Sequence, residues 1–246
     1  MMTLPPPRRL AAAALAGALV LAGCSQGSAP APDAAQQQAQ ARDAEAARNL
    51  DTYRQLLRIH NDQMAVSMGK DIVQRFPDSA AAKEVQQTLP EIEKRWTENS
   101  EKARLAALWQ YQVAPMAGGT QSTAATYDSQ PAGVRVRLVL RRHTSWGQSA
   151  FLFNDGHGGF VCKGNCTIAA KFDDKPRAIK AYAPSTGEPA LMIRDDKGFI
   201  ALLEKSKKIS LPVTLQDGEK KVELVYEVGG FVPDQWQALP KKGGKK

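Results

Sequence analysis

The clearest alternating pattern in this chain is Val134-Arg135-Val136-Arg137-Leu138-Val139-Leu140-Arg141, in which apolar residues alternate with arginines at every position but Val139. Successive side chains of a β-strand point to opposite faces of the sheet. The stretch therefore predicts a half-buried strand with an apolar inner face and a cationic outer face.

The same period of two continues downstream of this strand. Turn sequences such as Asn154-Asp155-Gly156 and Gln216-Asp217-Gly218 separate the runs, and residues 197–208 have the spacing of one short helix. Short alternating runs divided by turns are typical of an antiparallel sandwich or barrel, and we expect a β-sandwich over residues 111–236. The runs are Ala150–Phe153, Phe160–Cys162, Thr167–Phe172, Ile179–Ala183, Ala190–Ile193, Ile209–Leu215 and Lys221–Val228.

Upstream, residues 41–110 have the period of a helix. Asn61-Asp62 offers a break and an N-cap between two helical runs, and Pro77 ends the second of them. A third helix is expected from Ala80 towards Trp109, with a break near Pro90. The whole chain is thus predicted to be α+β, with an N-terminal helical hairpin or short helical bundle followed by a C-terminal antiparallel β-sandwich.

Part of this helical segment resembles a single tetratricopeptide-like unit. Ala65, Ile72 and Pro77 stand at the spacing of the small, apolar and terminal proline positions of that repeat. Gly69 stands where the repeat has an aromatic residue, and no second copy follows at a period of 34. The resemblance implies a helical hairpin that packs on another part of the protein, rather than a peptide-binding superhelix.

The N-terminal residues have the layout of an export signal. Arg8 and Arg9 precede an apolar run over residues 10–20, which is shorter than the about 20 apolar residues of a transmembrane helix. Leu21-Ala22-Gly23-Cys24 follows, and this motif resembles the lipobox of bacterial lipoproteins, which are cleaved before the cysteine. The resemblance implies a signal peptide over residues 1–23 and a lipid on Cys24 that anchors the protein to a membrane.

We expect a lipidated, flexible tether over residues 24–40, because the Ser, Pro, Ala and Gln residues there offer little apolar surface to bury. In the rule known from enterobacterial lipoproteins, Ser25 after the lipidated cysteine favours the outer membrane over the inner one, with the protein facing the periplasm. The alternative is an ordinary signal peptide cut nearby, with Cys24 as a spare thiol.

The net charge of +8 is concentrated at the ends of the chain. Arg8 and Arg9 belong to the export signal, and a basic, disordered tail is expected over residues 237–246. The body has no basic patch interleaved with aromatic residues, so we predict no nucleic acid partner. The lysines of the tail are Lys241, Lys242, Lys245 and Lys246.

Cys162 and Cys166 flank Lys-Gly-Asn, which predicts a hairpin tip. In an oxidising compartment two cysteines across a tight turn favour a disulfide, which would stabilise the fold by about 2 kcal/mol in the chain-entropy model. A redox or metal site would need C-x-x-C spacing or further Cys and His partners. We therefore predict a structural disulfide, no metal and no cofactor.

No constellation of residues predicts catalysis. His157 lies among glycines in a loop, His143 precedes Thr144-Ser145-Trp146, and His60 falls at a helix end. The charges of most interest are expected along one face of a strand, where they could contact an anionic glycan, a lipid headgroup or an acidic partner. The alternative is a solvated sheet face that discourages association. These residues are Arg135, Arg137, Arg141 and Arg142.

The C-terminal half resembles a domain of uncharacterised proteobacterial envelope proteins. The resemblance rests on Gly158-Gly159-Phe160-Val161-Cys162, on the run that begins at Cys166-Thr167, and on a last strand ending Val228-Gly229-Gly230-Phe231. It implies no activity. We expect a periplasmic lipoprotein acting as a non-enzymatic binding or scaffolding module, with an envelope protein or glycan as partner. An accessory protein of a secretion or assembly machine and an enzyme of envelope polymers are the alternatives.

Overall fold

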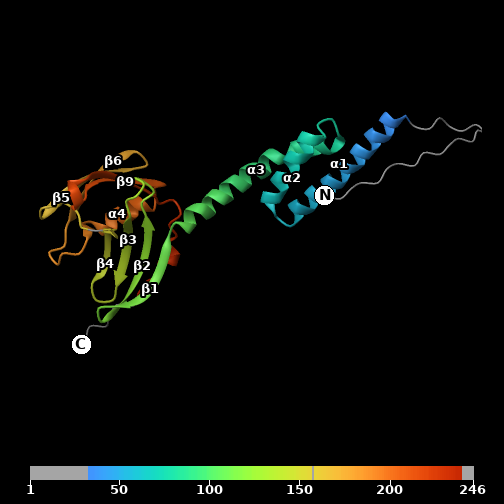
Figure 1. Cartoon of the computed structure of the whole chain (residues 1–246). Helices are drawn as coiled ribbons and strands as arrows, with labels where there is room; N and C mark the ends of the chain where they lie inside the picture. Colours follow the sequence, from blue (N-terminus) through green and yellow to red (C-terminus); the bar gives the residue numbers. More distant parts are fainter. Residues whose placement is uncertain (1–32, 157, 240–246) are drawn as a thin grey trace, which may run out of the picture.

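The computed structural model describes residues 33–156 and 158–239, and it consists of a helical body and a β-domain joined by one long helix (Figure 1). The predicted α+β class is confirmed. The export signal with Cys24, His157 and the lysine tail lie outside the described residues. Within the described residues, no helix combines the length and the apolar character that crossing a membrane requires.

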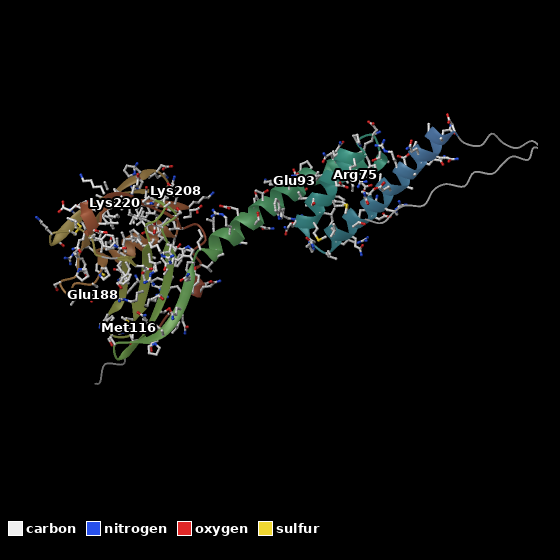
Figure 2. The ribbon with its side chains drawn as sticks, viewed as in Figure 1. Arg75, Glu93, Met116, Glu188, Lys208 and Lys220 are labelled. Atoms are coloured by element: carbon white, nitrogen blue, oxygen red, sulfur yellow. A yellow bond between two sulfur atoms is a disulfide. The ribbon has the colours of Figure 1, made fainter. Side chains whose placement is uncertain are left out.

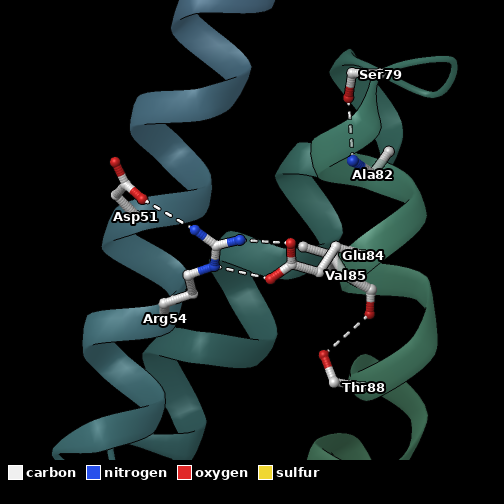
Figure 3. A network of polar contacts seen from close by, with 7 residues as sticks. All are labelled: Asp51, Arg54, Ser79, Ala82, Glu84, Val85 and Thr88. Atoms are coloured by element: carbon white, nitrogen blue, oxygen red, sulfur yellow. Dashed lines mark hydrogen bonds and ion pairs between the residues drawn. The ribbon is translucent and has the colours of Figure 1, made fainter.

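Three helices form the N-terminal body: α1 (Ala34–Arg58), α2 (Asp62–Arg75) and α3 (Ala80–Ala107). Asn61 caps α2 by accepting a hydrogen bond from the Met64 amide, and Ser79 caps α3 by accepting one from the Ala82 amide (Figure 3). The second helix therefore has its cap at the expected break, and the third helix begins at Ala80 as expected.

Two details of the helical prediction are wrong. The segment predicted as tether up to residue 40 is helical from Ala34, because alanine and glutamine are good helix formers even when fully exposed. The expected break near Pro90 is absent, since α3 runs continuously through that residue. Pro90 has no backbone N–H, so α3 lacks one backbone hydrogen bond, but the other hydrogen bonds of this long helix keep it continuous.

The helical body is held by a close-packed core and by ion pairs at its surface. Tyr53, Ile72 and Val85 are buried between the helices. Gly69 lies so close to them that a Cβ atom there would come within 2.9 Å of the Leu89 side chain, so its lack of a side chain permits this packing. At the surface, Arg54 of α1 binds Glu84 of α3 in a bidentate pair (Figure 3).

The β-domain is a single sheet of nine strands in the order β1-β2-β3-β4-β7-β6-β5-β8-β9, and every neighbouring pair is antiparallel. The helix α4 (Asp196–Leu203) lies where one was predicted. Strands β1 and β2 lie upstream of the alternating runs and were not among them. The strands are β1 (Gln110–Met116), β2 (Gly119–Tyr127), β3 (Val136–His143), β4 (Gly147–Asn154), β5 (Asn165–Phe172), β6 (Lys175–Tyr182), β7 (Ala190–Ile193), β8 (Lys208–Thr214) and β9 (Lys221–Glu227).

The sheet curves around one main hydrophobic core. Leu138 and Leu140 of β3 share this core with Leu211 of β8 and Leu224 of β9, and all four are completely buried. A bridge between Gln130 and Val225 also connects β9 to the segment that precedes β3. Strands from both ends of the sheet therefore enclose the same core.

A second, smaller apolar cluster lies on the opposite face of β2, β3, β4 and β7. Its buried members are Ala125, Val139, Phe151 and Ala190. Alternation along β3 produces both faces, since Leu138 and Leu140 point to the main core and Val139 to the other side. This second face carries the candidate site.

The joint between α3 and the β-domain is tight. A Cβ atom on Gly230, which follows β9, would lie 2.1 Å from the carbonyl carbon of Leu105 in the last turn of α3. Arg104 of the same turn binds Glu227 with 2.6 Å between Nη2 and Oε1, and this hydrogen bond lowers the pKa of the Glu227 carboxyl. The rings of Trp109 and Phe231 pack beside them with centroids 4.9 Å apart.

We predict that Gly230→Ala lowers the free energy of unfolding by about 1–3 kcal/mol relative to Gly229→Ala, because the new methyl group would force the backbones apart. Gly229 is the matched control, since a Cβ atom there meets its nearest neighbour at 3.4 Å. Urea unfolding followed by tryptophan fluorescence measures both variants. Equal stability of the two variants would contradict the close backbone contact.

Candidate functional site

A groove of about 520 Å³ crosses the face of the sheet that carries the smaller apolar cluster. We call it the arginine groove. Met116 of β1 and Glu188 of the loop before β7, which both line it, lie at the end of the β-domain away from α3 (Figure 2). The side chains that define its chemistry are Arg137, Arg141, Trp146, Phe151, Phe153 and Tyr182.

The register of β3 with its neighbours builds the groove. Arg141 lies opposite Thr123 of β2, and Val139 lies opposite Ala125. The short side chains of β2 therefore rise little above the sheet on this side of β3. On the other side, β4 presents the larger rings of Phe151 and Phe153. The small residues of β2 and the aromatic rings of β4 therefore leave a depression along the arginines of β3, which lies between them.

The guanidinium groups of the groove lie against aromatic rings. The Cζ atom of Arg137 is 5.0 Å from the centre of the Phe153 ring. The Cζ atom of Arg141 is 5.0 Å from the Phe151 ring and 5.1 Å from the Trp146 ring. A cation over an aromatic face is attracted by the electron density of the ring, and the rings also hold the guanidinium plane in place.

The two groove arginines differ in their polar partners. Arg137 makes an ion pair with Asp155, with 2.7 Å between Nη2 and Oδ1, and Tyr127 donates a further hydrogen bond to that carboxylate. Within the described residues, Arg141 makes no hydrogen bond and no ion pair, and its Nε atom is buried without a partner. Burial lowers the pKa of the Arg141 guanidinium, an effect that the negative charge of Glu188 opposes.

Glu188 is the one carboxylate among the described residues that line the groove. Its side chain is exposed and accepts a hydrogen bond from the hydroxyl of Thr186, which lowers the pKa of the carboxyl. Its charge is thus shared with solvent and with Thr186. The groove as a whole offers cations and rings to a ligand.

His143 positions Trp146 at one end of the groove. The Ser145 and Trp146 amides donate hydrogen bonds to Nδ1 of His143, so Nε2 carries the proton and donates to the Met116 carbonyl 2.9 Å away. The imidazole also stacks on the indole, with the two rings 3.8 Å apart. His143 was expected at an exposed loop tip, like His157, but it is the last residue of β3 and is buried.

The four predicted arginines do not share one face, and this expectation is wrong for Arg142. Arg137 and Arg141 line the groove, and Arg135 lies on the same side over the Tyr127 ring but just before β3 begins. Arg142 follows Arg141 directly and therefore points to the opposite face. There it stacks on Trp236 at 3.7 Å and donates a hydrogen bond to the Trp236 carbonyl.

The Cys162 and Cys166 sulfur atoms are 2.19 Å apart, which confirms the predicted pair. Their location differs from the predicted hairpin tip. The residues before Cys162 pair with the end of β8 through the bridge between Phe160 and Leu215, whereas Cys166 belongs to β5. Among the described residues, no group of His, Cys, Asp and Glu side chains could hold a metal ion.

A second surface feature lies on the helical body. Ile59, at the end of α1, is 64% exposed, and Trp96, in the middle of α3, is 36% exposed. Both line one shallow depression together with residues of the α1–α2 connection. We call these two residues the helix-end patch.

The chain matches no protein-family model, no curated protein and no solved structure in the comparisons made. Its function must therefore be inferred from its own residues. The arginine groove and the helix-end patch are the two features on which such an inference can be built.

We predict that Arg141→Met leaves the free energy of unfolding unchanged or raises it by up to about 1 kcal/mol, because it removes a partly buried charge that has no ion-pair partner. Arg137→Met is the matched variant and should cost about 1 kcal/mol, since it breaks the ion pair with Asp155. Thermal and urea unfolding compare the two proteins. A larger loss in Arg141→Met would mean that this arginine serves stability.

Proposed function

We propose that this protein is a lipid-anchored lipoprotein of the periplasm whose β-domain is a non-enzymatic binding module of the cell envelope. The arginine groove carries the proposal, because it presents Arg141 as a cation held between rings without an ion pair. An unpaired, partly buried cation lowers the stability of the fold. It can, however, form a strong charge-assisted hydrogen bond with a ligand that supplies an anion.

The anchor in this proposal is the lipid on Cys24, in the motif Leu21-Ala22-Gly23-Cys24. Stable anchoring requires more than one acyl chain, as in bacterial lipoproteins. The outer membrane, facing the periplasm, is the proposed location because Ser25 follows the cysteine.

The order of the parts supports a presenting role. The helical body is the first part of the chain that the structure describes, and α3 then leads to the β-domain. With 28 residues and a rise of about 1.5 Å per residue, α3 is about 42 Å long. The groove is thereby carried away from the helical body.

We also propose finer descriptions of the two parts. The β-domain is a sandwich whose two layers remain continuous through one hydrogen-bonded sheet, because strands from both ends of the sheet enclose a common core. In the helical body, α1 and α2 form a hairpin that packs on the first half of α3.

The side chains of the groove favour binding over catalysis. General acid–base catalysis needs titratable groups poised close to the working pH. The groove offers two guanidinium groups, aromatic rings and the exposed carboxylate of Glu188. These groups suit recognition of an acidic ligand.

The anchor is tested by feeding cells an alkyne-tagged fatty acid. We predict that the full-length protein takes up the label and sediments with the outer membrane, and that Cys24→Ala abolishes the labelling. A variant with Cys162→Ser and Cys166→Ser is the control and should keep the label. Labelling of the Cys24→Ala protein would refute the assignment.

A second candidate function is docking of a partner in a secretion or envelope-assembly machine. The helix-end patch favours it, since exposed apolar residues of this kind can mark interaction sites. We predict that a photo-crosslinker at position 96 captures an envelope protein in cells, whereas one at Glu98, about 200° further around α3, captures none. Equal capture at both positions would exclude a specific contact.

A further inference from the structure

We propose that the arginine groove binds an acidic glycan, with a carboxylate or phosphate group of the glycan on Arg141 and a sugar ring on Trp146. This inference rests on the proposed binding function and adds the class of ligand. It follows from the charge, the exposed ring and the shape of the groove.

The requirement for an acid comes from Arg141. Its guanidinium is partly buried between the Phe151 and Trp146 rings, and its Nε atom has no partner among the described residues. The planar fork of an arginine matches the oxygens of a carboxylate or a phosphate, and such bonds are stronger than neutral ones. The neighbouring Arg137 is already paired with Asp155, so Arg141 is the free anchor of the groove.

The requirement for a ring comes from Trp146. The indole remains 51% exposed, although His143 stacks on it and Arg141 lies close to it. Both of these residues lie on the same face of β3, and about half of the Trp146 surface remains accessible to a ligand. A half-exposed indole beside a cation suits the apolar face of a sugar ring that bears an acid.

The rest of the lining favours a sugar over an acyl chain. The apolar floor, formed by Ala125, Val139, Phe151 and Ala190, is only 5–8% exposed, so these four residues offer little surface to a lipid tail. Hydroxyl groups of a glycan can instead bond to the amide and hydroxyl side chains of the lining. These are Gln112, Gln121, Thr123 and Thr186.

Calorimetry with defined probes tests the proposal. The protein is the full-length chain carrying Cys24→Ala, which keeps every described residue and carries no lipid at position 24. The carboxylate probe is trigalacturonate, and its methyl ester is the uncharged control. The phosphate probe is a glucose disaccharide phosphorylated at one 6-hydroxyl, and vesicles containing phosphatidylglycerol are the lipid probe. Binding of either acidic sugar, with much weaker binding of the uncharged ester, is the expected result, and the two acids distinguish a carboxylate from a phosphate ligand.

Variants locate the binding site. Arg141→Met should weaken binding of the acidic sugar by about tenfold or more, because a charge-assisted hydrogen bond is lost. Trp146→Ala should also weaken it, whereas Arg177→Met, which removes an exposed arginine of β6 outside the groove lining, should not. Unfolding curves of each variant exclude loss of the fold as the cause.

Three results would overturn the inference: equal binding of the acid and its ester, unchanged binding by Arg141→Met, or binding of the anionic vesicles with no binding of either acidic sugar. Failure of the proposed function itself has a different signature. In that case Cys24 takes no lipid, and the protein binds neither the sugars nor isolated envelope fractions.

Discussion

Alternation of side chains along β3 is the constraint on which the β-domain depends. Leu138 and Leu140 are completely buried in the main core, while Arg137 and Arg141 lie on the opposite face. The buried leucines fix the register of β3, because a slip of one residue would exchange the two faces. The same register holds the arginines over the rings of β4. One strand therefore joins the packing of the domain to the chemistry of its groove.

The two groove arginines show how similar residues take different roles. Arg137 has Asp155 as its partner, and this pair fastens β3 to the end of β4. Among the residues that the structure describes, the Arg141 guanidinium contacts only aromatic rings, so folding removes part of its hydration without forming an ion pair. A ligand anion would meet a guanidinium that is already oriented and partly dehydrated. Preorganisation of this kind raises affinity because less ordering remains to be done on binding.

Local patterns were enough to predict the α+β class, the order of the two parts and the cysteine pair, since these depend on residue spacing. They were insufficient for β1 and β2, whose small and polar residues hide the alternation. Arg142 was misplaced because the arginines were grouped by charge, whereas their parity along β3 separates them. The role of Trp146 depends on a turn held by His143, and the sheet order depends on distant pairings such as Gln130 with Val225. Such contacts leave no trace in a local pattern.

The contact between Gly230 and Leu105 has a mechanical consequence. Backbone lies directly on backbone there, with no side chain between the two elements to act as a compliant layer. The β-domain then moves with α3 as a lever, and the helical body is the pivot. Because α3 packs in the helical core as far as Ile92, its free arm runs from Glu93 to Ala107 and is about 23 Å long, so a tilt of about 10° at the pivot displaces the far end by about 4 Å. A polymer held in the groove and a protein held at the helix-end patch would thus pull on the same rigid unit at two separate positions.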